Sequence, residues 1–351
     1  MIEVGLIGFG LGGRAFHAPI IHQVPGLRLA AILQRHGNTS EEFYPDAKIV
    51  RDLDELLAIE SISLIAVATP NETHYPYAKR ALEAGKHVVV DKPFTNTLAE
   101  ARELVALAQK KNLVLSVYQD RRFDSDFRAV QKLLADGTLG KMIRFETAFD
   151  RCRPVVKHGG WKELPKPGSG VFFDLGPHLI DQILLLFGPP EALLADIRNE
   201  REGTLTNDAF DVTFYYKNGF RAYAQQNMLA TAPRPHYRIT GTGGVYLKET
   251  LDPQEALLRA DKPATGDNWG VETENEWGTL TLFSDENLTP KKMPSLRGDY
   301  RDYYARIREA IEARGEPPVT FDQALKLIYT LELCAESSRK RAILPWVYSA
   351  A

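Results

Sequence analysis

The sequence predicts an α/β protein that begins with a doubly wound parallel sheet and continues into a second α/β domain with a mostly antiparallel sheet. Three observations lead to this prediction. Short apolar runs alternate with helical segments up to about residue 118, strand-like runs with fewer helices between them follow, and 351 residues exceed what one hydrophobic core usually serves. We place the two domains at residues 1–120 and 121–351.

The first domain alternates predicted strands with predicted helices. β-branched and apolar residues dominate the strands, whereas Ala and Leu recur at helical spacing in the segments between them, which gives each helix one face for packing on a sheet. We expect strands at residues 2–7, 27–33, 62–68, 87–90 and 113–118, and helices at 73–84 and 98–111.

The second domain follows a predicted helix at residues 125–136. Strands are expected at residues 142–150, 193–198, 209–216, 220–226 and 237–240. Large side chains occupy every second position over residues 210–216, and Asn218-Gly219 then supplies the positive φ angles of a tight hairpin turn. Residues 251–294, rich in Gly, Pro, Asp, Glu and Thr, are expected to form loops, with helices near 300–314 and 321–340.

Composition excludes several classes of partner. With 43 Lys and Arg against 46 Asp and Glu, the chain has no basic field that would attract nucleic acid or an anionic membrane. Its start lacks the basic region of a signal peptide, and no run approaches the roughly 18 apolar residues of a membrane span. The only cysteines, Cys152 and Cys334, fit neither a disulfide framework nor a metal-binding spacing. We therefore expect a cytoplasmic protein.

The first strand–helix connection carries a glycine-rich motif. Its residues are Gly8, Phe9, Gly10, Leu11, Gly12 and Gly13. In the pattern G-x-G-x-x-G, the first glycine permits the tight turn, the second lets the backbone approach a pyrophosphate, and the third allows close helix packing. Because the motif follows a strand and precedes a helix, we predict dinucleotide binding rather than a simple glycine-rich turn.

The end of the second predicted strand indicates which dinucleotide binds. An NAD-specific site places Asp or Glu about twenty residues after the glycine motif, where it accepts a hydrogen bond from the ribose 2′-hydroxyl. Gln34 and Arg35 occupy this position instead, and Arg35 can pair with a 2′-phosphate. We therefore favour NADP over NAD, with Gln34 and Arg35 as cofactor contacts. The alternative is a solvated Arg35 with Glu41 or Glu42 reaching back.

Two further strand ends place polar residues at the same edge of the sheet. These residues are Thr69, Pro70, Asn71 and His74 after one strand, and Asp91 and Lys92 after the next. Ligands of such sheets bind at the carboxyl ends of the strands, so we expect these residues to line the cofactor cleft. Lys92 can also hold a substrate oxygen as hydride leaves. The alternatives are a helix cap for Asn71 or Thr73 and a solvated surface position for Lys92.

A second candidate site lies near a predicted helix that ends at Phe187, with Pro177 in its first turn. Asp174 and His178 are four residues apart, so the carboxylate can fix the tautomer of the imidazole and raise its basicity. A helix cap with a half-buried histidine is the alternative. Asp181 would complete three metal ligands, but no further ligand set stands out, and we expect no metal.

Together these motifs resemble the Gfo/Idh/MocA family of nicotinamide-dependent sugar and polyol oxidoreductases, over essentially the whole chain. The family's usual Glu-Lys-Pro is Asp-Lys-Pro at residues 91–93, which leaves the lysine intact. Residues 120–126, 150–154, 160–161, 174–182 and 237–241 are similar to the branch that contains NADP-dependent scyllo-inositol dehydrogenases. The expected substrate is therefore a cyclic polyol or sugar.

The resemblance implies an N-terminal Rossmann domain and a C-terminal domain whose open sheet covers the nicotinamide with one face and makes oligomer contacts, as a dimer or tetramer, with the other. It also implies Lys92, Asp174 and His178 as the catalytic group. In the expected reaction, His178 takes the proton of a ring hydroxyl, oriented by Asp174, while Lys92 positions the oxygen and hydride passes to NADP. Lys92 is the alternative base.

Four residues complete the predicted site. Gln119 and Trp161 are expected to contact the cofactor, and Arg151 and Tyr237 the substrate, with surface charge or sheet packing as the alternatives. Three other functions stay open: reduction of another keto-sugar, glycoside hydrolysis with a retained NAD, and non-catalytic dinucleotide binding by a regulator. Lys92 and His178 argue against the regulator.

Overall fold

A computed structural model describes residues 1–156 and 163–349 of the chain, which divides into two compact units. Unit 1 comprises Met1–Phe123, Gln254–Trp269 and Asp299–Ile328, and unit 2 comprises Asp124–Pro253, Gly270–Gly298 and Tyr329–Ala351. Two segments that the sequence analysis places in the second domain, 254–269 and 299–328, thus group with unit 1.

The sheet of unit 1 is parallel, with the strand order β3-β2-β1-β4-β5-β6. Its strands are β1 (Ile2–Ile7), β2 (Leu27–Leu33), β3 (Lys48–Val50), β4 (Ile62–Val67), β5 (His87–Asp91) and β6 (Leu115–Tyr118). The central strands β1, β4 and β5 are almost entirely buried, as expected of strands covered on both faces. This order and direction confirm the predicted doubly wound sheet.

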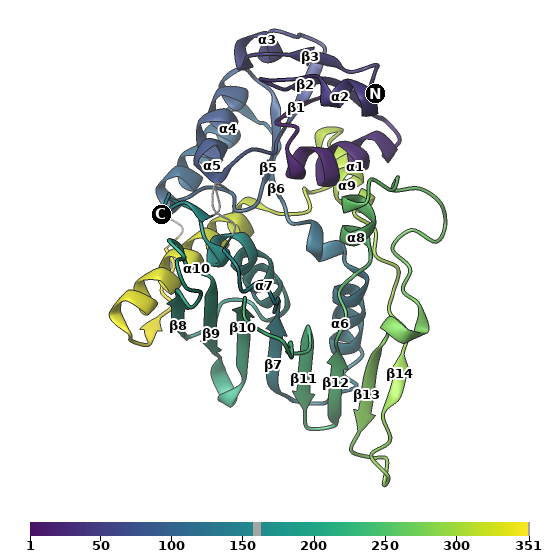
Figure 1. Cartoon of the computed structure of the whole chain (residues 1–351), viewed down its shortest axis with the longest axis vertical. Helices are drawn as coiled ribbons and strands as arrows, with labels where there is room; N and C mark the ends of the chain where they lie inside the picture. Colours follow the sequence, from purple (N-terminus) through teal and green to yellow (C-terminus); the bar gives the residue numbers. More distant parts are fainter. Residues whose placement is uncertain (157–162, 350–351) are drawn as a thin grey trace. The chain divides into compact units, whose positions relative to one another are not determined.

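Helices cover both faces of this sheet. Figure 1 shows α4 and α5 on one face and α1 and α9 on the other. The helices of unit 1 are α1 (Ala18–Gln23), α2 (Thr39–Phe43), α3 (Leu53–Leu57), α4 (His74–Glu83), α5 (Leu98–Lys111), α8 (Gln254–Arg259) and α9 (Arg301–Ile311). Short turns of π- or 3-10-helix precede α1 (Gly12–His17), precede α4 (Asn71–Thr73) and follow β6 (Asp120–Phe123). α10 (Phe321–Lys340) contributes residues to both units.

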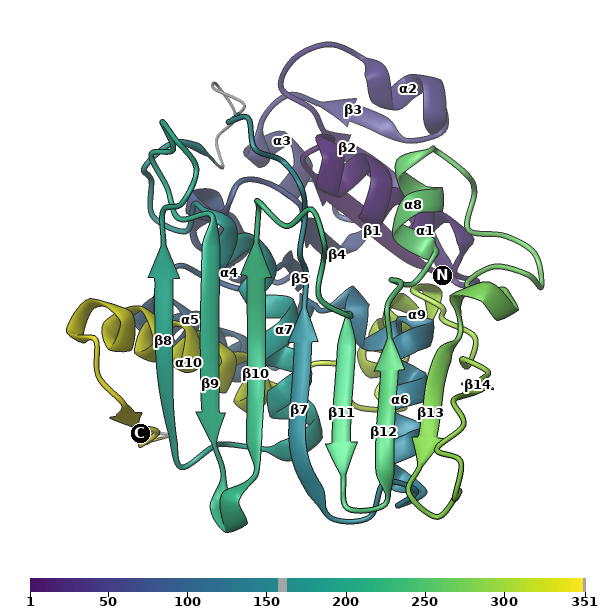
Figure 2. The same ribbon diagram turned by 60° about the horizontal axis from the view of Figure 1, so that its bottom comes forward.

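The sheet of unit 2 is mostly antiparallel, in the order β14-β13-β12-β11-β7-β10-β9-β8-β15, and β7 and β10 pair in parallel. Its strands are β7 (Met142–Ala148), β8 (Ala192–Arg198), β9 (Ala209–Tyr215), β10 (Arg221–Asn227), β11 (Tyr237–Gly241), β12 (Gly244–Lys248), β13 (Gly278–Leu282), β14 (Lys291–Met293) and β15 (Leu344–Pro345). Figure 2 shows α6 (Ser125–Ala135) and α7 (Val171–Phe187) behind these strands. The predicted fold class is therefore confirmed for this unit too.

The predicted hairpin between β9 and β10 is also confirmed. Asn218 and Gly219 have φ angles of 62° and 80°, and they lie in a short 3-10 turn, Lys217–Gly219. Along β9, Phe210, Val212 and Phe214 are completely buried, whereas the residues between them are half-buried. The period of two therefore separates the helix-covered face of the sheet from its open face.

Two local predictions are wrong. The helix expected to begin near Pro177 is α7, which already begins at Val171, so Pro177 lies inside it. The earlier start is stabilised by Asn207, whose backbone carbonyl accepts from the Val171 N–H and whose side-chain oxygen accepts from the Phe172 N–H at 2.7 Å. These bonds come from residues distant in sequence, so the pattern around Pro177 does not reveal them.

Residues 251–294, expected to form loops, contain α8, β13 and β14. The two strands lie toward one end of the sheet, and their side chains are largely half-buried or exposed. Backbone pairing alone places them there, so they carry no strong apolar alternation. The strands β3, β12 and β15 also lie outside the strands predicted from the sequence; β3 and β15 are very short, whereas β12 alternates buried and half-buried residues and was missed.

Candidate active site

The glycine-rich loop between β1 and the first helical turn has the conformation that its glycines allow. Gly8 has a φ of +97°, and a Cβ atom there would lie 2.5 Å from the carbonyl oxygen of Ala68. A Cβ atom on Gly13 would lie 2.0 Å from the Gly8 carbonyl oxygen, so both positions exclude larger residues. Among the described residues, and apart from the chain neighbours of Gly10, no heavy atom lies within 4 Å of a Cβ atom at this position. The backbone at Gly10 is therefore open to a ligand, as pyrophosphate binding requires.

Phe9 and Leu11 separate the glycines of this loop. The Phe9 ring lies against Phe43 and Tyr44, with centroid distances of 6.2 and 6.1 Å. Leu11 is 45% exposed. The loop is therefore anchored on one side by ring packing and exposed on the other.

The turn after β2 is held by the side chain of Gln34. Its amide nitrogen donates to the His36 carbonyl oxygen at 2.8 Å and to the Thr39 hydroxyl at 3.1 Å, and its oxygen accepts from the Ser40 N–H. Gln34 was predicted as a cofactor contact, and these bonds show that it also fixes the backbone of the turn.

Arg51, which follows β3, braces the same turn and was missed by the sequence analysis. Its guanidinium donates to the carbonyl oxygens of Gln34 and Gly37, both at 2.6 Å, and to the side-chain oxygen of Asn38. Arg35 lies within this braced turn, is exposed, and makes no ion pair with any residue in the described parts of the chain. Its guanidinium is thus available to an anion.

Thr69, Pro70, Asn71 and His74 connect β4 to α4. Of the two residues proposed as helix caps, Thr73 occupies the N-cap position of α4 and Asn71 does not, and the Thr73 side chain makes no capping hydrogen bond there. Asn71 is buried and has polar contacts. Its contact with a cofactor stays a prediction.

His74 is completely buried at the start of α4. Its Nδ1 lies 2.8 Å from the Pro93 carbonyl oxygen and its Nε2 lies 2.8 Å from the Thr69 carbonyl oxygen. Burial lowers the pKa of His74, against the opposing effect of the Asp91 carboxylate. Both ring nitrogens therefore face backbone oxygens rather than open space.

Asp91 ends β5 and lies beside three basic side chains. Its Oδ1 accepts from the Lys92 N–H at 2.8 Å, its Oδ2 lies 3.9 Å from His17 Nε2, and a Cβ on Gly12 would be 3.1 Å from it. Burial alone would raise the pKa of Asp91, but His17, Lys92 and His74 lower it. The carboxylate thus lies against the glycine-rich loop, and the half-buried Lys92 follows it directly.

Gln119 and Asp120 follow β6, the next strand in the sheet. Gln119 is buried, and its amide nitrogen has no hydrogen-bond partner among the described residues. Burial raises the pKa of Asp120 to about 6; Asp91 adds to this effect, and Arg121 and Lys92 oppose it. Asp120 was not predicted as a site residue, yet it shares the electrostatic environment of Lys92.

The predicted cofactor residues of unit 1 follow the carboxyl ends of β1, β2, β4, β5 and β6, or lie in the helical turns next to them. Because the strands are parallel and adjacent, their carboxyl ends meet at one edge of the sheet. The structure therefore brings together the predicted cofactor residues of unit 1, with the open backbone of Gly10 among them. These residues fit a dinucleotide.

In unit 2, Asp174 and His178 lie on α7, one turn apart and on the same face of the helix. His178 is 6% exposed, and its ring meets Phe149 edge-on at 6.4 Å. Both residues have further side-chain interactions. The geometry allows the carboxylate to orient the imidazole, and this role stays a prediction.

The other predicted residues of unit 2 have different surroundings. Tyr237 is completely buried in the sheet, and its hydroxyl donates to Gln182 Oε1 at 2.8 Å, as the packing alternative predicts. Arg151 is half-buried, and its N–H donates to the Asn227 carbonyl oxygen. Trp161 lies outside the described residues. Contacts of these three residues with ligands stay predictions.

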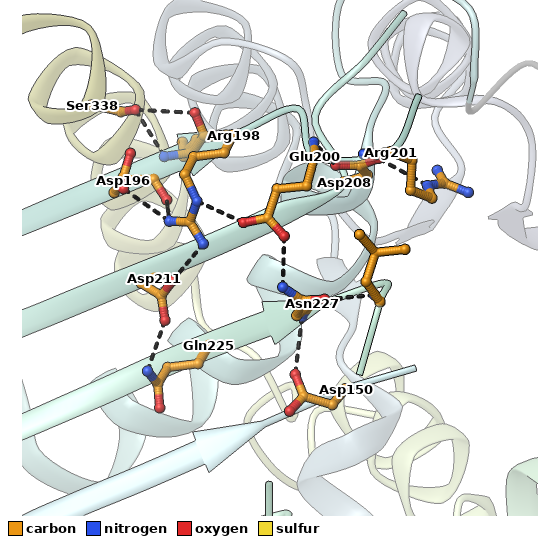
Figure 3. A network of polar contacts seen from close by, with 12 residues as sticks. Asp150, Asp196, Arg198, Glu200, Arg201, Asp208, Asp211, Gln225, Asn227 and Ser338 are labelled. Atoms are coloured by element: carbon orange, nitrogen blue, oxygen red, sulfur yellow. Dashed lines mark hydrogen bonds and ion pairs between the residues drawn. The ribbon is translucent and has the colours of Figure 1, made fainter. Parts of the chain in front are cut away.

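Arg201 and Asp208 form a buried charged pair that the sequence analysis missed (Figure 3). Their side chains are 3% and 0% exposed, and Arg201 Nε donates to Asp208 Oδ2 at 2.8 Å. Arg201 also donates to Glu163 at 3.1 Å and to the Arg153 carbonyl oxygen at 3.4 Å. Arg201 therefore holds the Arg153 backbone and the Glu163 side chain. The sequence gives no indication that this pair is buried, since an Arg and an Asp seven residues apart are usually solvated on the surface.

Two properties of the whole chain bear on the site. Residues 1–156 and 163–349 contain no group of three or more His, Cys, Asp or Glu side chains arranged to hold a metal ion. Within the same ranges, every helix is too short or too polar to cross a membrane.

Two family models match the chain. The model described as an oxidoreductase family with an NAD-binding Rossmann fold matches residues 2–119, and the model of the GFO/IDH/MocA C-terminal domain matches residues 127–247. Together the two models cover most of the chain and the strands, loops and helix that carry the candidate site.

Individual proteins resemble the chain over nearly its full length. The oxidoreductase YdgJ of Escherichia coli is 42% identical over 98% of both chains. The scyllo-inositol 2-dehydrogenase (NADP(+)) IolW of Bacillus subtilis is 34% identical over 98% of this chain and 96% of its own. The solved structure of the oxidoreductase YPO2259 from Yersinia pestis superimposes with a TM-score of 0.93 at 41% identity, covering 99% of this chain and 98% of that one.

Proposed function

The chain belongs to the Gfo/Idh/MocA oxidoreductase family, and from this premise we propose that it oxidises a ring hydroxyl of a cyclic polyol with NADP. The coarser function is shown by the family: the chain is an NAD(P)-dependent dehydrogenase that acts on CH–OH groups. The first candidate substrate is scyllo-inositol, because one full-length relative is named for that substrate and for NADP.

The braced turn after β2 carries the proposal of NADP. Arg35 is exposed and makes no ion pair within the described ranges, while Gln34 and Arg51 hold the backbone around it. A free guanidinium on a fixed turn suits a phosphate monoester, to which it can donate two hydrogen bonds. NAD has a neutral hydroxyl at the corresponding position and would gain nothing from the charge.

The two candidate catalytic groups have distinct tasks in this proposal. The bound cofactor supplies the acceptor for hydride. Lys92 is the residue directly after β5. Its side-chain ammonium holds the substrate oxygen and stabilises the negative charge that develops on it. His178 takes the hydroxyl proton, and Asp174, one helical turn away, keeps the imidazole in the tautomer that can accept it.

Initial rates at the reduced-nicotinamide absorbance band test this proposal. The purified chain is assayed with inositol isomers and common aldoses, each with NADP and with NAD. We expect turnover of scyllo-inositol with NADP. The Arg35→Ala variant should raise KM for NADP by roughly 10- to 100-fold, the equivalent of one charged hydrogen-bonding group, and leave KM for NAD unchanged.

Arg28 supplies the matched control, since it lies on β2 at the end far from the turn and pairs with Glu3. Arg28→Ala should leave both constants unchanged. An unchanged NADP constant in Arg35→Ala would refute the cofactor assignment. Binding of a cofactor without reduction by any polyol or sugar would favour a keto-sugar reductase, and a cofactor that remains bound through purification would favour a hydrolase.

The open face of the unit 2 sheet supports a dimer or tetramer as a further part of the proposal. This face carries two cation–ring pairs, the exposed Arg144 4.1 Å from the ring centre of Tyr223 and the half-buried Arg221 4.6 Å from the ring centre of Tyr215. Arg and Tyr are enriched at interfaces between subunits. Light scattering of the purified chain measures its mass, and a monomer at assay concentration would contradict this part.

A further inference from the structure

We infer that His74 is a positioning residue that fixes the carbonyl of Pro93 and, through it, the backbone that presents Lys92. The inference deepens the proposed function, because it rests on the role proposed there for Lys92. His74 was predicted to contact the cofactor directly, whereas the contacts of its ring point to an indirect role.

The ring of His74 lies between two backbone carbonyls. It is 0% exposed, and both ring nitrogens are 2.8 Å from a carbonyl oxygen, Nδ1 from that of Pro93 and Nε2 from that of Thr69. A carbonyl oxygen only accepts hydrogen bonds, so the ring must donate. A neutral ring donates to one of the two carbonyls and a protonated ring donates to both. The inference requires a proton on Nδ1, so that the ring, whether neutral or protonated, donates to the Pro93 carbonyl.

The contact with His74 is the main polar contact that can hold the backbone of Pro93. Proline has no N–H, so the carbonyl is its only polar backbone group. Among the residues that the structure describes, His74 is the one group that can donate to that carbonyl. On the other side of Lys92, its own N–H donates to Asp91 Oδ1 at 2.8 Å. The backbone of Lys92 is thus held by Asp91 before it and by His74 after it.

The Thr69–Pro70 turn has other supports. The Thr73 hydroxyl lies 2.7 Å from the Thr69 hydroxyl and 2.6 Å from the Pro70 carbonyl oxygen, and the Thr73 N–H donates to the same carbonyl. Loss of the His74 ring nitrogens should therefore disturb Lys92 more than it disturbs the turn that lines the cofactor cleft. This difference predicts an effect on kcat rather than on cofactor affinity.

The test compares His74→Phe, which keeps a ring but has no donor, with His87→Phe. His87 is the matched control because it lies at the opposite end of β5 and its Nδ1 accepts from the Val114 N–H at 2.9 Å. His74→Gln returns a donor, and Lys92→Met removes the ammonium itself. For each variant we would measure kcat, the substrate KM, the Kd of NADP by fluorescence, and thermal stability.

We expect kcat of His74→Phe to fall by about 10²-fold, the effect of a displacement of roughly 1 Å at a reacting group. The Kd of NADP should stay close to that of the natural chain, His74→Gln should recover part of kcat, and His87→Phe should keep kcat even where it loses stability. If His74→Phe does not fold, His74→Met, which is also without a donor, replaces it with the same expected result.

Three outcomes would overturn the inference. If His74→Phe folds and keeps full kcat while Lys92→Met loses activity, the inference about His74 is overturned and the role proposed for Lys92 stands. Equal losses of kcat in His74→Phe and His87→Phe would show a general effect of stability on the strand. Full kcat in Lys92→Met would overturn both the role proposed for Lys92 and the inference that depends on it.

Discussion

The strand-end region of unit 1 and the α7 region of unit 2 hold their candidate residues in different ways. In unit 1, the residues follow strand ends and are fixed by contacts to nearby backbone, as His74 is by Thr69 and Pro93, five and nineteen residues away. In unit 2, Asp174 and His178 lie on one helix, whose first turn is fixed by Asn207, 35 residues away from its partner. The contacts of His74 thus span fewer residues of sequence than the contact that fixes the first turn of α7, although Asp91 in the same region of unit 1 lies against His17 from a more distant part of the chain.

The two regions also differ in the chemistry they offer. The unit 1 region has open backbone at Gly10 and the free cation of Arg35, which suit a ligand that carries phosphates. The unit 2 region offers a nearly buried imidazole beside an aromatic ring, with the carboxylate of Asp174 one helical turn away on α7, which suits proton transfer. The difference suggests a division of labour in which unit 1 binds the cofactor and α7 supplies the acid–base group.

Replacement of His178 tests this division most strongly. His178→Gln removes the proposed base, so kcat should fall by about 10²- to 10⁴-fold. The glycine-rich loop and Arg35 belong to unit 1 and are unchanged, so the Kd of NADP should stay the same. Initial rates and cofactor fluorescence of the same preparation measure the two quantities.

His236 provides a control of the same residue type in unit 2. It is 1% exposed, stacks on Phe149 at 4.7 Å, and its Nε2 lies 3.6 Å from Asp126 Oδ2. His236→Gln should lower the stability of the protein, but it should reduce kcat far less than His178→Gln does. Full activity of His178→Gln at every pH, or a loss of cofactor binding in that variant, would break the comparison.

The same difference explains how much of the fold could be predicted from the sequence. β1, β2 and α5 have the predicted bounds, because buried parallel strands and an amphipathic helix have strong periodic patterns. β13 and β14 were missed, because strands near a sheet end with half-buried or exposed side chains show little apolar alternation. The start of α7 was placed too late, because Asn207 stabilises it from a distant part of the chain.

The candidate site follows the same rule. The glycine motif gave the conformation of Gly8 and the close approach at Gly13, since both depend only on backbone sterics. The brace formed by Arg51 and the buried pair of Arg201 and Asp208 were not predictable, because a charged residue in a loop is normally solvated. Side-chain contacts of this kind require the three-dimensional structure.

The buried pair of Arg201 and Asp208 offers a sharper measure of long-range support in unit 2. Arg201→Met leaves the Asp208 carboxylate, which is 0% exposed, without its guanidinium. We expect a loss of roughly 3–5 kcal/mol in the free energy of unfolding, measured with urea. Arg198 is the control in the same network (Figure 3), with a side chain that is 31% exposed, and Arg198→Met should cost about 1 kcal/mol or less. Equal losses of unfolding free energy in the two variants would mean that burial does not make the contacts of Arg201 more stabilising than those of Arg198.

Asp120 tests the unit 1 region, because its buried carboxyl interacts electrostatically with Lys92. Burial raises its pKa to about 6, whereas an unfolded chain has an Asp pKa of about 3.9. Between about pH 4 and pH 6 the folded state therefore binds more protons than the unfolded state, and stability falls as pH rises. Asp120→Asn removes this titration, so its gain in unfolding free energy over the natural chain should grow from about zero below pH 4 to about 1–3 kcal/mol above pH 6. Urea unfolding of both chains across this range measures the difference. A gain that did not depend on pH would show that Asp120 ionises normally, and the strand-end region of unit 1 would then hold its charges without cost to stability.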